Sequence, residues 1–402
     1  MKEHVLPEGW GNPKLLDLCD IKTGKVDANH HSNDGIYPFF TCALEPLKSK
    51  TYSFDDELII LPGNGANVGT VFYYNGKIEA YQRTYVLHKI QANPKFIYFH
   101  LLYLWKERTA KKQFGSATNY IRMSNFEEYS LPLPPLPEQQ YLSQKLTALL
   151  DEVAQTKQRL EAIPAQLKQF RQSVLADAVS GRLTEENADK WNTQPLKSLT
   201  TKIGSGSTPK GGNDVYKDSG IPFVRSLNIH TYFIKYEDLV FIDEVQAEKL
   251  KNVKIKENDV LLNITGASIG RVNIAPKEFV NGRVNQHVAI IRLKQEVILP
   301  KFLHLILASP KFQKWIEGEN YGTTRQALTK GMLETLEIHY PDIARQTKIV
   351  QKVETYFAFA DEIEAQVNAA LENVNLLTQS ILAKAFSGEL SAEWRTQQAV
   401  KN

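Results

Sequence analysis

Polar side chains gather in glycine-rich segments at corresponding places in the two halves of the chain. Arginine, lysine, asparagine and glutamine offer hydrogen-bonding ends that suit base edges, and serine and threonine hydroxyls suit phosphates. Each residue alone could equally belong to an ordinary solvated turn. The collective pattern favours paired recognition surfaces with different targets, because the places match while the sequences differ. The paired segments are residues 22–25 with 204–210, 82–84 with 285–287, and 115–119 with 322–326. The candidate nucleic-acid-binding residues are Lys22, Thr23, Lys25, Asn64, Asn67, Gln82, Arg83, Ser116, Thr118, Asn119 and Arg122 in the first half, and Ser205, Ser207, Thr208, Lys210, Arg225, Ser226, Thr265, Ser268, Asn285, Gln286, Thr323, Thr324, Arg325 and Gln326 in the second.

Motifs for catalysis are missing from the sequence. It has no Asn/Asp-Pro-Pro-aromatic run of the kind that holds an extruded adenine in methyltransferases, and residues 63–70 lack the lysine of a phosphate-binding loop. The nine histidines show no spacing typical of paired metal ligands, and His30 and His31 are better explained as solvated or ligand-facing. These absences favour binding over turnover and predict no catalytic residue, no metal site and no cofactor site in this chain.

Composition places the chain among ordinary globular proteins. With 402 residues, 42% of them hydrophobic, it has room for two or three domains with cores of their own. A net charge of +3 permits a nucleic-acid partner without arguing for one. Two cysteines supply neither a disulfide scaffold nor a zinc ribbon. No apolar run approaches the roughly 20 residues of a membrane span, so a cytoplasmic location is expected.

The sequence is an internal repeat. Residues 180–183 (Ser-Gly-Arg-Leu) recur 207 residues later as 387–390 (Ser-Gly-Glu-Leu), and the same offset relates Gln139 to Gln346. Pro-Lys-Phe at 94–96 recurs at 300–302. Strand-like runs at 58–61 and 70–74 precede a short helix at 96–104, and the second half repeats this order with a strand at 259–262 and a helix at 302–307.

Two long helices with a heptad pattern follow the two domains. The proline-rich run 131–137 must be extended, and Pro137 suits the first turn of a helix. In the second copy Asp342 is the expected N-cap, and Gly181 and Gly388 are expected stops after the helices. Pro164 is expected to kink the first helix near Ala162. The coiled-coil seam is predicted to be Leu146, Val153, Leu160, Leu167 and Val174 in the first helix and Val353, Ala360, Val367, Val374 and Ile381 in the second.

Chain direction makes a paired arrangement of these helices antiparallel, because each helix leaves its own domain. The alternative, one helical face packed on a globular core, would require a wider apolar stripe. The tail repeats another motif: Trp191-Asn192-Thr193-Gln194 resembles Trp394-Arg395-Thr396-Gln397. This similarity predicts that the tail is the beginning of a further repeat and lies beside the N-terminal domain.

Taken together, these features resemble the specificity subunit of type I restriction–modification systems. The resemblance is carried by residues 133–140 (Leu-Pro-Pro-Leu-Pro-Glu-Gln-Gln), by 385–390 (Ala-Phe-Ser-Gly-Glu-Leu), and by 206–209 followed by 220–225. It covers essentially the whole chain. The second copy departs from the pattern with Arg345 where the family usually has glutamate, and the first domain has Thr23-Gly24-Lys25 in place of Gly-Ser-Thr-Pro.

The resemblance implies an α+β fold with two target-recognition domains joined by two long antiparallel coiled-coil helices. The expected divisions are 1–136 for the first domain, 137–181 for its helix, 182–341 for the second domain, 342–389 for its helix, and 390–402 for the tail. It also implies a non-catalytic prokaryotic DNA reader of an asymmetric, two-part site. Two methyltransferase subunits carrying S-adenosylmethionine and two restriction subunits using ATP and Mg²⁺ would be its partners. A structural adaptor joining two protein-binding domains is the alternative.

Overall fold

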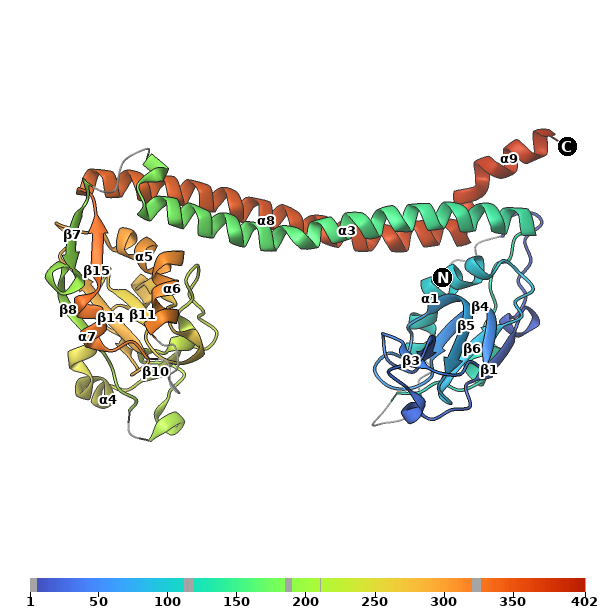
Figure 1. The fold of residues 1–402 in the computed structure, drawn as a ribbon, viewed down its shortest axis with the longest axis horizontal. Helices are drawn as coiled ribbons and strands as arrows, with labels where there is room; N and C mark the ends of the chain where they lie inside the picture. Colours follow the sequence, from blue (N-terminus) through green and yellow to red (C-terminus); the bar gives the residue numbers. More distant parts are fainter. Residues whose placement is uncertain are drawn as a thin grey trace. The chain divides into compact units, whose positions relative to one another are not determined.

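The computed structural model describes residues 6–111, 114, 119–184, 190–209, 211–319 and 327–401 (Figure 1). The chain divides into two compact units. Unit 1 comprises Met1–Glu161 and Asn368–Asn402, and unit 2 comprises Ala162–Val367. Each unit contains a globular domain and one part of each of two long helices, α3 (Leu136–Val179) and α8 (Ile343–Phe386). The fold is therefore α+β, with two mixed domains joined by two long helices, as the sequence predicts.

Among its described residues, the domain of unit 1 is built on one six-stranded sheet in the order β1-β6-β4-β5-β2-β3. Its neighbouring strands are antiparallel except for β2 and β5, which run parallel. Alternate residues of β4 enter two cores: Ile59 and Leu61 pack with helix α1, while Leu58 and Ile60 pack on the other face. The elements are β1 (Asp20–Thr23), β2 (Tyr37–Phe40), β3 (Leu47–Ser49), β4 (Phe54–Pro62), β5 (Phe72–Ala80), β6 (Thr84–His88), α1 (Pro94–Lys111) and α2 (Ser124–Glu127).

The described residues of the domain of unit 2 form three smaller sheets, in the orders β12-β11-β14-β8, β10-β9-β13 and β15-β7. Helix α1 of unit 1 corresponds here to two helices, α5 and α6. They are separate because Pro310 holds Ser309 in an extended conformation between them. The strands are β7 (Asn192–Pro195), β8 (Thr200–Ser205), β9 (Ile221–Val224), β10 (Val240–Ile242), β11 (Val260–Asn263), β12 (Val272–Ile274), β13 (Arg283–Val284), β14 (Val288–Leu293) and β15 (Glu337–Tyr340). The helices are α4 (Glu244–Lys249), α5 (Pro300–Ala308), α6 (Pro310–Glu319) and α7 (Lys330–Thr335).

The two long helices pack against each other in opposite directions. In unit 1 Leu146, near the start of α3, shares a core with Leu382, near the end of α8. In unit 2 Leu175, near the end of α3, shares a core with Val353, near the start of α8. Helix α3 continues through Pro164. Seam positions Leu146, Leu167, Val174, Val353, Ala360, Val367 and Ile381 are buried, and Val153, Leu160 and Val374 are partly buried. The narrow apolar stripe on otherwise exposed helices agrees with a coiled-coil seam.

Equivalent hydrogen bonds fasten each long helix to its own domain. Gln139 donates from Nε2 to the Pro134 carbonyl at 2.7 Å, and Gln346 donates likewise to the Pro341 carbonyl at 2.8 Å. Each glutamine also accepts, at 2.8 Å, from the backbone N–H of the residue before the domain's helix α1 or α5. Both glutamines are buried. The 207-residue repeat is thus a repeat of specific contacts as well as of sequence.

The repeat also includes the ends of the long helices. Lys145 donates to the carbonyl of Leu390 at 3.1 Å, and Lys352, 207 residues later, donates to the carbonyl of Leu183 at 3.0 Å. Gly181 and Gly388 have φ angles of 78° and 81°, which is the left-handed conformation expected after a helix. Among the helices of the described residues, none is both long and apolar enough to cross a bilayer.

The similarity between the two tryptophan segments does not extend to their structures. Asn192, next to Trp191, begins strand β7, which pairs with β15. Trp394 instead lies in a helix, α9 (Ala392–Lys401). The prediction that the tail begins a further repeat is therefore wrong at the level of local structure. A pairing strand is available beside Trp191, whereas Trp394 follows the helix-favouring pair Ala392-Glu393.

A buried aromatic cluster in unit 1 joins the end of α8 to α1. The ring of Phe386 lies 4.7 Å from that of His100, edge to face, and stacks on Tyr103 at 5.8 Å. The Nδ1 atom of His100 lies 3.0 Å from the Tyr129 hydroxyl. Burial, with a smaller effect of the Arg108 charge, lowers the pKa of His100 to about 3. His100 is therefore neutral at ordinary pH.

The neutral state of His100 predicts a pH dependence of stability. Because the folded-state pKa lies below the ordinary value of 6.5, the unfolded chain binds the proton first as the pH falls. The contribution of neutral His100 to the stability of the folded chain is complete above pH 6.5 and is lost between pH 6.5 and about 3. Urea unfolding should show that His100→Phe removes about 2 kcal/mol of the difference in stability between pH 7 and pH 5. If the difference in stability between pH 7 and pH 5 is the same in His100→Phe as in the wild type, His100 does not cause the pH dependence.

Candidate nucleic-acid interface

Three loops of unit 1 meet through close contacts at glycine. A Cβ atom at Gly24 would lie 1.8 Å from the Ala80 carbonyl oxygen, and one at Gly63 would lie 2.2 Å from that of Arg83. Backbone hydrogen bonds join the same places, from Gly24 to Thr84 at 3.3 Å and from Gly63 to Arg83 at 2.9 Å. The segments around residues 22–25, 63–67 and 81–84 are therefore adjacent because no side chain separates them.

A fourth segment of unit 1 joins these loops. The backbone N–H of Gly65 donates to the Asn119 carbonyl at 2.8 Å, and Asn67 donates from Nδ2 to the Cys42 carbonyl at 2.8 Å. Arg122 lies over the ring of Phe114 at 4.4 Å and donates to the Tyr120 hydroxyl at 2.7 Å. The exposed candidates in unit 1 are Lys22, Thr23, Lys25, Gln82, Arg83, Asn119 and Arg122, and Asn64 and Asn67 are partly buried.

The loops of unit 2 are assembled in the same way. A Cβ atom at Gly206 would lie 1.6 Å from the Val284 carbonyl oxygen, and the Gly206 N–H donates to the Asn285 carbonyl at 3.1 Å. Thr208 donates to the side chain of Gln286, whose Nε2 lies 3.0 Å from a ring nitrogen of His287. Ser205, Ser207, Thr208 and Gln286 are exposed, and Thr265 and Ser268 are partly buried.

Three of the predicted residues make contacts within their own domain. Arg225 donates to the Asp238 carbonyl at 2.6 Å, and its guanidinium lies 5.3 Å from the ring centre of Tyr216. Ser226 is partly buried, and its carbonyl accepts from Asn263 at 2.8 Å. Asn285 is buried and accepts from the backbone N–H of His287 at 3.1 Å. Ser116, Thr118, Lys210, Thr323, Thr324, Arg325 and Gln326 lie outside the described residues.

Burial shifts the pKa of two titratable groups on strands that adjoin these loops. Burial, followed by the charge of Lys22, lowers the pKa of His88 on β6, which favours the neutral imidazole. Burial and then the neighbouring Arg292 lower the pKa of Lys202 on β8. The described residues contain no group of three His, Cys, Asp or Glu side chains that could hold a metal ion. We call the glycine-joined loops of each unit its loop cluster. The exposed candidates of the unit 1 cluster include Lys22, Lys25, Arg83 and Arg122 and add positive charge to its hydrogen-bonding groups, whereas the exposed candidates described in the unit 2 cluster are uncharged.

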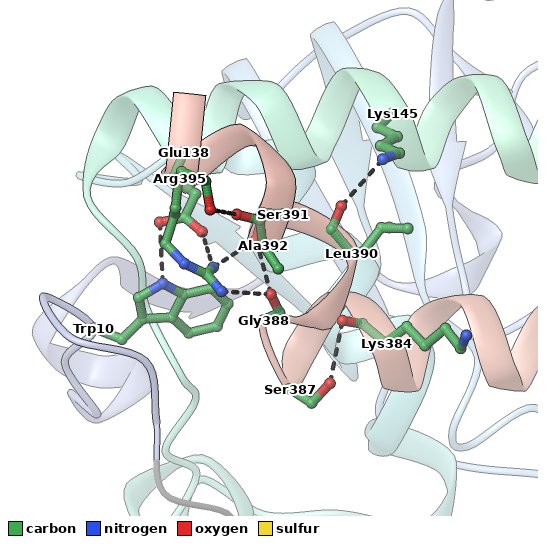
Figure 2. Close-up of polar contacts among 11 residues, drawn as sticks. Trp10, Glu138, Lys145, Lys384, Ser387, Gly388, Leu390, Ser391, Ala392 and Arg395 are labelled. Carbon is green, nitrogen blue, oxygen red and sulfur yellow. Dashed lines mark hydrogen bonds and ion pairs between the residues drawn. The ribbon is translucent and has the colours of Figure 1, made fainter. Parts of the chain in front are cut away.

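A second polar cluster of unit 1, missed by the sequence analysis, holds the tail (Figure 2). We call Trp10, Glu138 and Arg395 the tail clasp. Glu138 accepts from Trp10 Nε1 at 3.1 Å and from Arg395 at 2.5 Å, and it is almost completely buried. Arg395 also donates to the Gly388 carbonyl at 2.8 Å and to Ser391 at 2.9 Å. The clasp joins three segments that are far apart in the sequence.

The same position in the second copy carries the opposite charge. Arg345 stands where the repeat places Glu138, and its backbone N–H donates to the predicted N-cap Asp342 at 3.0 Å. The buried Nε1 of Trp191, the counterpart of Trp10, has no hydrogen-bond partner among the described residues. The departure at Arg345 was visible in the sequence, but the pairing of Glu138 with a residue 257 positions later was not.

Comparisons with known proteins agree with this architecture. A type I restriction modification DNA specificity domain matches residues 7–165 and 188–373. The type I restriction enzyme EcoDI specificity subunit of Escherichia coli is 33% identical, over 99% of this chain and 92% of that protein. A solved chain from work on complex assembly and conformational transition of the type I R-M system has a TM-score of 0.72 at 18% identity, covering 95% of this chain and 98% of that chain. The HsdS subunit from Thermoanaerobacter tengcongensis has a TM-score of 0.58 at 17% identity, covering 96% of this chain and 99% of its own.

The two solved structures support the fold, while the domain match and the EcoDI relative support the family. The domain match occurs twice, once for each copy of the internal repeat. The EcoDI relative aligns across both domains and both long helices, which covers nearly its whole length. The chain belongs to the family of type I restriction–modification DNA specificity subunits.

Proposed function

We propose that this chain reads an asymmetric, two-part DNA site, one half with each domain. The observation that carries the proposal is the pair of loop clusters, in which the same glycine contact, at Gly24 and Gly206, positions different polar side chains. Exposed Gln82, Arg83 and Arg122 in unit 1 and Gln286 in unit 2 have the forked ends that distinguish base edges. Because the exposed side chains differ between the domains, the two half-sites would differ.

Chemistry would be supplied by partner chains. The relatives are named as subunits of restriction enzymes, which supports a role in a larger complex. In our proposal two methyltransferase subunits bring S-adenosylmethionine and methylate one adenine per half-site, and two restriction subunits use ATP and Mg²⁺. The chain itself would bind DNA without catalysing a reaction, in the cytoplasm of a prokaryotic cell. Its net charge of +3 supports weak DNA binding by the chain alone.

Sequencing of host DNA for N6-methyladenine, with and without this gene, tests the proposal. Loss of one gapped, asymmetric motif in the deletion strain is the expected result, and the motif would give both half-sites and the spacer. A strain that carries active methyltransferase subunits and loses no motif would contradict the proposal. That result would favour the structural adaptor that the sequence leaves as the alternative.

The long helices are proposed to set the number of unread base pairs between the half-sites and to help dock the methyltransferase subunits. Removing one matched heptad from α3 and from α8 keeps the seam in register and shortens each helix by about 10 Å. We expect the methylated motif to retain both half-sites while its spacer shortens by up to about three base pairs. Deleting a heptad from one helix only is the control, because it disrupts the seam. An active variant with an unchanged spacer would exclude the helices as the ruler.

A further inference from the structure

The guanidinium of Arg122, in the unit 1 loop cluster, is held against two aromatic rings. Its carbon Cζ lies 4.4 Å from the ring centre of Phe114 and 5.2 Å from that of Tyr120. Its Nη2 atom also donates to the Tyr120 hydroxyl at 2.7 Å. Arg122 is nevertheless an exposed residue. An exposed arginine normally samples many rotamers, and these contacts with the rings and the hydroxyl restrict it to few.

The backbone that carries Arg122 is fixed to the loop cluster. Tyr120 and Phe114 exchange two backbone hydrogen bonds, each of 3.1 Å. The residue between Tyr120 and Arg122, Ile121, is buried, and its N–H donates to the Gly63 carbonyl at 2.9 Å. The two rings and the guanidinium therefore belong to one hydrogen-bonded framework. A side chain held in this way is presented from a defined position, as a recognition site requires.

The guanidinium keeps most of its hydrogen-bonding capacity. A guanidinium carries five N–H donors, and the Tyr120 hydroxyl accepts from one of them. The described residues offer Arg122 no carboxylate partner. In unit 2, by contrast, Arg292 donates to both carboxylate oxygens of Asp259, at 2.7 and 2.8 Å. Arg122 is held largely through its planar face, which leaves N–H groups at its edge for a ligand outside the chain.

A planar pair of N–H groups with a fixed direction matches the edge of a guanine. Guanine presents two neighbouring acceptors, N7 and O6, in the major groove, and an arginine can donate to both at once. A phosphate can be neutralised by a mobile cation, so a phosphate contact does not require such a support. The aromatic support of Arg122 therefore favours contact with a base.

We propose that Arg122 reads one guanine of the half-site recognised by unit 1, and that Phe114 and Tyr120 position its guanidinium for this contact. The inference rests on the proposed function and deepens it, because it assigns one base to one side chain. Arg83 is the matched comparison in the same loop cluster. It is exposed, and its carbonyl accepts from the N–H of Gly63 at 2.9 Å, but no aromatic ring of the described residues supports its guanidinium.

DNA binding by the chain assembled with its methyltransferase subunits tests the assignment. The duplexes carry the motif found by sequencing, with each specified base pair changed singly. Arg122→Ala and Arg122→Lys should lose discrimination at one G·C pair of one half-site and keep it at every other position. Their affinity for the intact site should fall roughly 5- to 150-fold. Arg83→Ala, the control, should keep discrimination at that G·C pair.

A single-atom change in the DNA tests the same contact. Replacing the guanine of that pair by 7-deazaguanine removes the N7 acceptor. The wild type should bind the modified duplex more weakly than the intact one. Arg122→Ala should bind the two duplexes equally, because it no longer has the donors that N7 would accept.

Phe114→Leu and Tyr120→Phe test the positioning residues. Phe114→Leu keeps an apolar side chain without an aromatic face, so it should reduce discrimination at the same G·C pair, and Phe114→Tyr should restore it. Tyr120→Phe keeps the ring but removes the hydroxyl, so it should have a smaller effect at that pair. A purely structural role would instead weaken all positions of the half-site together.

Three results would overturn the proposal. An equal loss on every duplex in the Arg122 variants would mark a phosphate contact. Unchanged discrimination at every G·C pair would exclude a base contact. Full discrimination in both Phe114→Leu and Tyr120→Phe would exclude the rings as its support. The wild type on the same duplexes tests the proposed function separately: it must discriminate in both half-sites, whatever the variants of Arg122 do.

Discussion

Replacing Glu138 by alanine is expected to release α9 and to lower the free energy of unfolding of unit 1 by about 2–4 kcal/mol. Glu138 is 2% exposed and is the acceptor for both Trp10 and Arg395. Its removal leaves the buried indole N–H and the guanidinium without their shared carboxylate. The expected loss of stability is smaller than for a fully buried ion pair, because the Arg395 side chain is 27% exposed.

Hydrogen exchange of residues 392–401 and urea unfolding are the measurements for Glu138→Ala. Exchange in α9 should become faster, while the domain core around Phe96 keeps its protection. Arg345→Ala is the matched control at the equivalent position of the second copy. It removes an ion pair with Asp342 that is about half exposed, so a change of less than about 1 kcal/mol is expected. Unchanged protection of α9 in Glu138→Ala would show that the stacking of Trp394 on Tyr141, at 5.5 Å, is enough to hold the tail.

Local patterns in the sequence predicted the helical elements well. The heptad series that begin at Leu146 and at Val353 identify α3 and α8. A helical seam can be predicted in this way because it depends on spacing within one segment. The strand expected at 58–61 is confirmed as part of β4, and the strand expected at 259–262 as β11, one residue later. The parallel pairing of β2 with β5 was not predictable, because it joins segments about 40 residues apart through backbone contacts that leave no local signature.

The loop clusters illustrate a different limit of sequence reasoning. Polar residues near glycine were identified, but their exposure depends on which loops meet in space. Arg225 lies in a polar segment of the sequence, yet in the fold it contacts Asp238 and Tyr216. Tyr120 was not among the candidates, although it positions Arg122 beside the unit 1 loops. Which of the exposed candidates contact bases stays a prediction.

Gly206→Ala is expected to weaken reading of the second half-site while leaving the first intact. The new Cβ would lie 1.6 Å from the Val284 carbonyl oxygen, so the 205–208 loop must move away from the 284–287 loop. Forcing extra volume into such a contact costs about 1–3 kcal/mol, which is roughly 5- to 150-fold in affinity. Gly204→Ala is the control two residues away, because nothing lies within 4 Å of its added Cβ.

Binding by the chain assembled with its methyltransferase subunits, measured on DNA with either half-site scrambled, separates the two readers. The wild type should discriminate against both scrambled duplexes. Gly206→Ala should lose discrimination only for the second half-site. Gly24→Ala, whose Cβ would meet the Ala80 carbonyl oxygen at 1.8 Å, should lose it only for the first. Because each glycine joins loops of one unit, equal losses at both half-sites in a folded Gly206→Ala variant would contradict independent reading by the two domains.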